Sequence, residues 1–344
     1  MRQQMCRHAV PRRFISPLGG PQLGRTCARV AGNFIFFWRQ RTLGENPERW
    51  RMTTSRERFG IALGIAGVLL FGGTLPATRL AVVAFDPFFL SAARAAIAGC
   101  TGLALLLVLR RPIPPRASWL EFVLAGICTI IGFPVFMALA MAHVPASHGG
   151  VVLGIIPLAT AAAAALVAHE RPSAGFWLAS IVGAAIVVVF MVRQSAANTI
   201  QLGDIYLLGT VLSGAFGYTL SGRLSRTRPG WEVISWQVAS FLPLSLIAAY
   251  LLWPQSLAGV PASAWAGLTY VSFVSQFFAF FVFNAAMAMA GVARAGQLML
   301  LQPFVIVALS IPVNGERFEL STLLYAAAVV AVVIVGQRMR VTRG

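Results

Sequence analysis

The chain has no lysine, few acidic residues and few cysteines. All 27 basic residues are arginine, against ten acidic residues. A P-loop needs the lysine of Gly-x-x-x-x-Gly-Lys, so an ATP-driven pump of that type within this polypeptide is excluded. Cys6, Cys27, Cys100 and Cys128 have no paired or metal-type spacing, so no disulfide framework is indicated. We expect no cofactor and no metal site.

Charge is scarce in general. The 344 residues are 58% hydrophobic and 11% charged, with a mean hydropathy of +0.78. Soluble domains carry about 25% charged residues, so lipid must be the solvent for most of this chain. The net charge of +17 can also indicate nucleic-acid binding. However, the arginines beyond the N-terminal tail stand at the ends of apolar segments, which favours membrane lipids as the partner and no nucleic acid.

Long apolar stretches predict an all-α integral membrane protein. A span needs about 20 mostly apolar residues, and these runs are too long and too uniformly apolar for barrel strands. Two histidines near span ends, His143 and His148, lack the company that a metal site needs, so we expect a structural role. The ten expected spans are 60–81, 88–109, 118–142, 147–168, 174–192, 204–222, 231–253, 264–289, 293–313 and 320–337.

The first 51 residues differ from the rest. They are basic, contain one short apolar stretch, and show neither a signal-peptide design nor a packing pattern. We interpret residues 1–51 as a disordered extension or an untranslated region, with Met52 as the favoured start. Residues 339–344 would form a cytoplasmic tail.

The arginines of the loops segregate to one side of the membrane. Arg79, Arg193 and Arg317 fall on one side. Eleven fall on the other: Arg110, Arg111, Arg116, Arg171, Arg223, Arg226, Arg228, Arg294, Arg338, Arg340 and Arg343. Because positive charge favours the cytoplasmic side, both termini are expected in the cytoplasm, with the chain in the inner (cytoplasmic) cell membrane.

The chain also resembles itself. A shift of 146 residues gives nine identities in the 32 positions from Ala140 to Arg171, including Pro157 with Pro303 and Glu170-Arg171 with Glu316-Arg317. We interpret this as a duplication. Since each half has five helices, the second would enter the membrane from the opposite side, giving two inverted repeats, as in many transporters. The alternative is that duplication is only an economical way to build a large bundle.

Several motifs resemble the drug/metabolite transporter superfamily, in particular its ten-helix EamA-type members. The motifs are Phe71-Gly72-Gly73-Thr74, Arg94 early in the second span, and a proline followed thirteen residues later by Glu-Arg, at Pro157/Glu170 and Pro303/Glu316. The resemblance covers residues 60–338, as EamA-like repeats at 60–193 and 204–338. It implies export of amino acids, related metabolites or drugs through a central cavity, generally without ATP. Phe71 departs from a tryptophan that is frequent in the family.

Arg94 is the leading candidate for binding the solute. It lies about two turns inside its span, where lipid exposure would be costly. Its guanidinium could bind a carboxylate or phosphate through two parallel hydrogen bonds. A structural role is equally open, with Asp86 as its partner.

Other polar residues within spans are weaker candidates, and each could instead form an interhelical hydrogen bond. They are Gln276, Gln302, Asn284, Gln237, Tyr218 and Thr74. Gly73, Pro76, Pro157 and Pro303 are interpreted as helix breaks. No acidic residue lies in the middle of a span, so an obvious proton carrier is missing.

The sequence therefore predicts a secondary transporter that exports a small metabolite, such as an amino acid, by alternating access, and not an enzyme. A membrane-embedded enzyme or a non-transporting scaffold is the alternative. An enzyme would need clustered His, Asp or Glu near one interface. The expected partners are a small-molecule solute and lipids, and the sequence leaves a homodimer open.

Overall fold

The computed structural model describes residues 47–168, 171–194, 200–225, 227–290, 298–338 and 341–342. The chain divides into two units, Met1–Ser55 and Arg56–Gly344, and the helical bundle belongs to the second. Most of the expected N-terminal extension, 1–51, lies outside the described residues. That interpretation stays a prediction.

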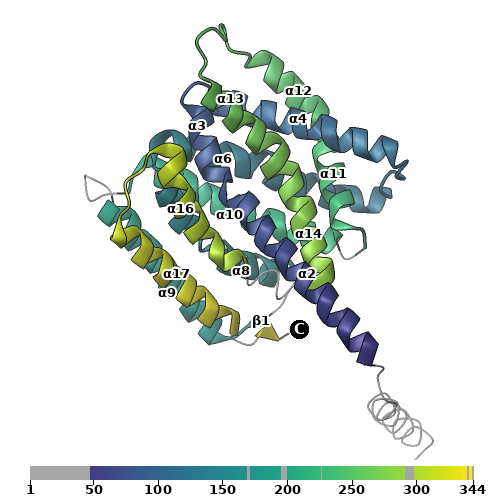
Figure 1. Ribbon diagram of the computed structural model, residues 1–344, viewed down its shortest axis with the longest axis vertical. Coiled ribbons are helices and arrows are strands. Elements are labelled where there is room, and N and C mark those ends of the chain that lie inside the picture. The colour runs from purple at the N-terminus through teal and green to yellow at the C-terminus, as the bar shows by residue number, and fades with distance from the viewer. Residues whose placement is uncertain are drawn as a thin grey trace, which may run out of the picture. The chain divides into compact units, whose positions relative to one another are not determined.

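Residues 58–194, called here the first half, are helical with short connections (Figure 1). Its helices are the later part of α2 (Pro47–Gly72), α3 (Thr74–Val82), α4 (Pro87–Val108), η1 (Arg116–Ser118), α5 (Trp119–Gly126), η2 (Ile127–Gly132), α6 (Phe133–His143), α7 (Ala146–Leu153), α8 (Ile156–Ala168) and α9 (Ala174–Gln194).

Residues 200–338, the second half, are built in the same way. Its helices are α10 (Leu202–Leu224), α11 (Gly230–Ser240), α12 (Leu242–Leu251), α13 (Ala262–Thr269), η3 (Tyr270–Phe278), α14 (Ala279–Ala290), η4 (Met299–Leu301), α16 (Gln302–Asn314) and α17 (Leu320–Arg338). The strands among the described residues, β1 (Arg171–Pro172) and β2 (Val341–Thr342), form one short antiparallel pair.

Five of the described helices are long and apolar enough to cross a membrane, and six if the bent pair α11 and α12 forms one span. The five are Arg58–Val82, Pro87–Val108, Arg116–His143, Ala146–Val167 and Ala262–Phe283. Shorter apolar helices cover Trp177–Arg193, Met299–Asn314 and Leu320–Val335. The integral membrane class is thus supported, whereas the number of ten spans stays a prediction.

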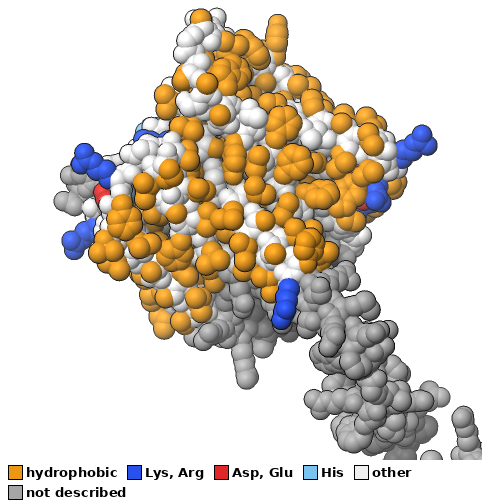
Figure 2. All heavy atoms as spheres, in the orientation of Figure 1, with side chains coloured by type: hydrophobic (Ala, Val, Ile, Leu, Met, Phe, Trp, Pro, Cys, Tyr) orange, Lys and Arg blue, Asp and Glu red, His pale blue; other side chains and the backbone are white. Residues whose placement is uncertain are grey.

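The surface agrees with a lipid environment. Figure 2 shows one face covered largely by hydrophobic side chains, with the few visible arginines near its margins. On α9, for example, Leu178 and Ile181 are 64% and 65% exposed. Water-soluble monomers rarely expose contiguous apolar surface on this scale, so lipid is the environment that this surface requires.

The two halves interlock. The most extensive helix contacts join α4 to α11 and α12, α10 to α6 and α8, α13 to α3, α16 to α7, and α17 to α9, and each joins one half to the other. Figure 1 shows α9 and α17 side by side. Glycine permits the closest approaches: a Cβ on Gly267 of α13 would lie 2.4 Å from the carbonyl oxygen of Ala77 in α3. The halves therefore form one bundle.

Both halves contain a π-helical segment. The shift of 146 residues carries η2 (Ile127–Gly132) onto residues 273–278, which lie within η3 (Tyr270–Phe278). π-Helical turns are rare and occur often at functional sites. Their recurrence at matching positions is a structural counterpart of the sequence repeat.

Candidate functional site

Arg94 is buried between the halves. Its side chain projects from α4, and the residue is only 4% exposed. Asp86, the alternative partner, instead caps α4, accepting hydrogen bonds from the backbone N–H groups of Phe88 and Phe89 at 2.8 and 3.1 Å. The interpretation of Asp86 as the partner of Arg94 is therefore wrong, because its carboxylate accepts hydrogen bonds from the backbone N–H groups of the first turn of α4.

Neutral groups of η3 hold the Arg94 guanidinium. Nε donates to Oε1 of Gln276 at 2.9 Å, and Nη2 donates to Oγ of Ser275 at 3.2 Å. The Ser275 hydroxyl also hydrogen-bonds that of Thr74, at 2.8 Å. This chain of contacts joins α4 and α3 of the first half to η3 of the second.

These polar groups border a cavity to which both halves contribute. Water could be centred in only about 20 Å³ of it, which is room for about one molecule. In this conformation the cavity is too small for a metabolite, so a solute would require it to widen. Its lining is Phe71, Thr74, Leu75, Arg94, Thr129, Phe133 and Leu153 from the first half, with Gly214, Tyr218, Ser275, Gln276, Phe280 and Gln302 from the second.

Irregular points in the helices supply most of the polar lining. Thr74 is the first residue of α3, directly after Gly73, and Gln302 is the first residue of α16. Thr129 lies in η2, while Ser275 and Gln276 lie in η3. Such breaks are tolerated at membrane depth where the backbone is covered by protein or faces a cavity, which is the situation here.

Aromatic rings form one wall of the cavity. The ring of Phe280 lies 5.0 Å from that of Phe71 and 6.3 Å from that of Tyr218, measured between centroids. Tyr218 in turn lies 6.2 Å from Phe133. The cavity thus combines a cation and polar groups with a wall suited to an apolar body.

Five of the sequence candidates meet at this cavity: Thr74, Arg94, Tyr218, Gln276 and Gln302. Gln237 does not, because its Nε2 donates to Oγ of Ser221 at 2.9 Å, outside the lining. Asn284 belongs to α14, and its side chain lies outside what the structure describes.

The expected helix breaks lie at or near real interruptions. Gly73 separates α2 from α3, with Pro76 in the first turn of α3. Pro157 and Pro303 are each the second residue of a helix, α8 and α16. Proline is tolerated there because the first turn has N–H groups without helical partners.

Sequence reasoning missed two hydroxyls. Ser275 and Thr129 both line the cavity, and neither was a candidate. The shift of 146 residues carries Thr129 onto Ser275, so a search for polar residues retained in both halves could have found them.

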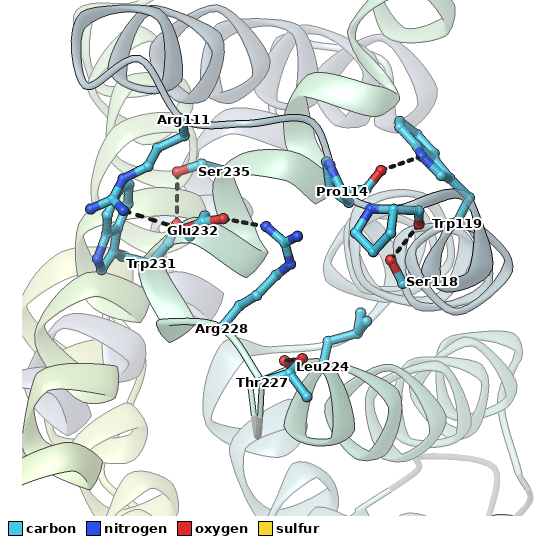
Figure 3. A network of polar contacts seen from close by, with 11 residues as sticks. Arg111, Pro114, Ser118, Trp119, Leu224, Thr227, Arg228, Trp231, Glu232 and Ser235 are labelled. Carbon is cyan, nitrogen blue, oxygen red and sulfur yellow. Dashed lines mark hydrogen bonds and ion pairs between the residues drawn. The ribbon is translucent and has the colours of Figure 1, made fainter.

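An ion-pair cluster lies away from the cavity, where α4 ends and α11 begins (Figure 3). Glu232 is buried and forms ion pairs with two arginines. Its Oε1 lies 2.5 Å from Nη1 of Arg228, and its Oε2 lies 3.9 Å from Nη1 of Arg111. The Arg111 guanidinium also lies over the Trp231 ring, 4.9 Å from its centroid. Figure 3 shows both arginines pointing toward Glu232. The contacts tie the connection after α4 to the start of α11.

Two further carboxylates hold helix starts. The backbone N–H groups of Ala146 and Ser147, at the start of α7, donate to Glu316 at 2.7 and 3.1 Å. Asp204 accepts the N–H of Gln201 in a capping box of α10, and its other oxygen lies 2.7 Å from Nε2 of buried His148. The contact with Asp204 fits the structural role expected of His148, and Glu316 acts as a helix cap.

The sequence is similar to those of curated transporters. A family model described as the EamA-like transporter family matches residues 58–192 and again 201–336. The curated Bacillus subtilis (strain 168) protein "Uncharacterized transporter YdeK" is 40% identical over 241 residues, covering 70% of this chain and 84% of that protein. "Uncharacterized transporter YyaM" of the same strain is 21% identical over 267 residues, covering 75% and 87%.

A solved crystal structure shares the fold. It aligns with a TM-score of 0.55 at 21% identity, covering 81% of this chain and 97% of that chain. At this identity the likeness concerns the fold alone.

Proposed function

Because the chain belongs to the EamA-like transporter family, we propose that it is a secondary transporter that exports a small metabolite through the cavity around Arg94. The observation that carries the proposal is the composition of the cavity wall. A buried arginine and several polar side chains, drawn from both halves, surround a space between the halves. A bundle that served only as a scaffold would have no need of an arginine there, because a buried charge is costly.

Alternating access is the mechanism that this arrangement suits. Two inverted five-helix repeats, within ten spans, would exchange conformations and open the cavity to each side of the membrane in turn. The matching π-helical segments support this interpretation. So do the contacts of α4 with α11 and α12 and of α9 with α17, because the shift of 146 residues carries each first-half helix onto its partner. The small cavity would then represent an occluded conformation.

The roles of the lining residues follow from their positions. Arg94, Gln276, Gln302, Tyr218 and Thr74 would contact the solute. The interruptions at Gly73, Pro157 and Pro303 would allow segments of helix to move separately. The arginine distribution favours the cytoplasmic membrane, with both termini in the cytoplasm.

Solute flux into proteoliposomes containing the full chain tests the proposal. A panel of radiolabelled amino acids, carboxylic acids, nucleosides and organic cations would be offered with and without a pH gradient. We expect saturable flux of one class above that of protein-free liposomes. Folded protein that transports nothing on a broad panel would contradict the proposal and direct attention to a membrane enzyme or a scaffold.

A further inference from the structure

We infer that the solute is an organic monoanion, a carboxylate on an apolar or aromatic body, rather than a zwitterion or an organic cation. The inference rests on the proposed transport function and names the substrate class of the same site. Its basis is the balance of charge and of hydrogen-bond donors around Arg94.

The first observation is that Arg94 has no counterion among the acidic side chains that the structure describes. Six acidic side chains are described by the structure, and each has another partner. Asp86 caps α4, Glu316 caps α7, Glu121 pairs with Arg223, Asp204 contacts His148, Glu232 binds Arg228, and Glu319 accepts from Ser321. Among the described residues, Arg94 forms side-chain hydrogen bonds only with the neutral groups of Gln276 and Ser275. A buried charge without a partner is costly, and a bound anion would relieve that cost.

The second observation is that several hydrogen-bond donors around the cavity have no partner among the described residues. A guanidinium has no acceptor, so the oxygen of Gln276 must face Arg94 Nε, and its Nε2 must point elsewhere. In the part of the chain that the structure describes, no hydrogen-bond partner is found for Nη1 of Arg94, Nε2 of Gln276, the amide of Gln302 or the hydroxyl of Tyr218. A carboxylate, with two acceptor oxygens, matches such a set.

The third observation concerns what the cavity lacks. None of its described lining residues is acidic, so no carboxylate is available for the ammonium group of an amino acid or an amine. One guanidinium also balances one negative charge, which favours a carboxylate over a phosphate dianion. The wall of Phe71, Phe133 and Phe280 would take the apolar body. The geometry therefore selects against amino acids and organic cations as solutes.

Binding to the purified full chain in detergent tests the inference without requiring transport. The probes form two matched sets: 3-phenylpropionate, phenylalanine and phenethylamine, then 4-methylpentanoate, leucine and isopentylamine. Inorganic phosphate completes the panel. Within a set the apolar body is nearly constant while the charged groups change. We expect at least one acid to raise the unfolding temperature by a few degrees at saturation, with no comparable shift from its zwitterion, its amine or phosphate.

Three variants sharpen the test. Gln276→Glu keeps the shape and the hydrogen bond to Arg94 but supplies the missing counterion, so the acid should bind roughly ten- to a hundredfold more weakly while the fold is kept. Arg94→Gln should weaken binding similarly. Arg116→Gln removes an exposed arginine outside the cavity and should bind as the unmodified chain does.

The outcomes are distinct. Stabilisation by an amine or a zwitterion but by neither acid would overturn the inference, and so would acid binding that survives in folded Gln276→Glu. An absence of any shift from either acid would overturn it as well. Flux of a cation or zwitterion in proteoliposomes would support the transporter proposal and overturn the anion class. Acid binding without any flux would support the anion class and overturn the transporter proposal.

Discussion

Arg94 donates from Nε to Oε1 of Gln276 across 2.9 Å, although 182 positions separate the two residues in the chain. The bond joins α4 of the first half to η3 of the second at the cavity wall. A motion that separates the halves at this point must break or rearrange the bond. The cost of leaving a buried arginine unsatisfied therefore links the position of the halves to the occupancy of the cavity.

The close approach of α3 and α13 gives a prediction of stability. A Cβ at Gly267 would lie 2.4 Å from the Ala77 carbonyl oxygen, which belongs to the backbone and cannot rotate away. Gly267→Ala should destabilise the fold by about 1–3 kcal/mol, the usual cost of overpacking. In Gly222→Ala the new Cβ would meet nothing within 4 Å. Thermal unfolding in detergent should show a lower unfolding temperature for the first variant only; equal temperatures would refute this packing.

The cap on α7 gives a second prediction of stability. Glu316 accepts from the N–H groups of Ala146 and Ser147 with both carboxylate oxygens. Glu316→Gln removes the negative charge and one acceptor from the helix start, so we expect a loss of about 1 kcal/mol. The neighbouring Arg317 is exposed, and Arg317→Gln serves as the control. Hydrogen exchange at the start of α7 should become faster in Glu316→Gln alone, and unchanged exchange would count against the cap.

Burial separates the two carboxylate clusters outside the cavity. The Glu232 side chain is 5% exposed and faces two arginines, whereas Glu121 and its partner Arg223 are 35% and 40% exposed. Exposed ion pairs contribute about 0–1 kcal/mol, and hydrogen bonds to buried charges about 1.5–3 kcal/mol. Glu232→Gln should therefore lower the unfolding temperature more than Glu121→Gln does. The opposite order would contradict the arrangement in Figure 3.

Sidedness can be tested by cysteine labelling. Thr227 and Ser256 are exposed and lie in the connections after α10 and α12. With the native cysteines replaced, Thr227→Cys should react with a membrane-impermeant maleimide only from the cytoplasmic side, and Ser256→Cys only from the opposite side. Reversed labelling would overturn the orientation inferred from the arginines.

Hydrophobicity made part of this architecture predictable. The expected span 118–142 corresponds to one continuous helical stretch, Arg116–His143. The π-helical turns within such stretches were not foreseen, because they depend on contacts with distant helices rather than on local composition. The ten-span count stays a prediction. α10 contains polar positions such as Asp204 and Thr210 and is not among the helices apolar enough to cross a membrane, and three further apolar helices are shorter than a span.

The site was predictable to a similar extent. Polarity inside an apolar run was enough to select Arg94, Gln276, Gln302, Tyr218 and Thr74, all of which line the cavity. It could not show that Gln237 faces Ser221, or that Asp86 caps its own helix. In a helix that is apolar all round, the sequence does not show which face is turned to the core. The depth of a polar residue within a span can therefore be estimated from sequence, whereas the neighbour that its side chain faces cannot.

Counterflow through the full chain in proteoliposomes tests the central claim most directly, with the best solute of the flux panel and three proteins: the unmodified chain, Arg94→Gln and Arg116→Gln. We predict saturable exchange by the unmodified chain and by Arg116→Gln. In folded Arg94→Gln exchange should fall by roughly tenfold or more, because the charge-assisted hydrogen bonds to the solute are lost. Exchange by folded Arg94→Gln at the unmodified rate would contradict the claim that this cavity binds the solute.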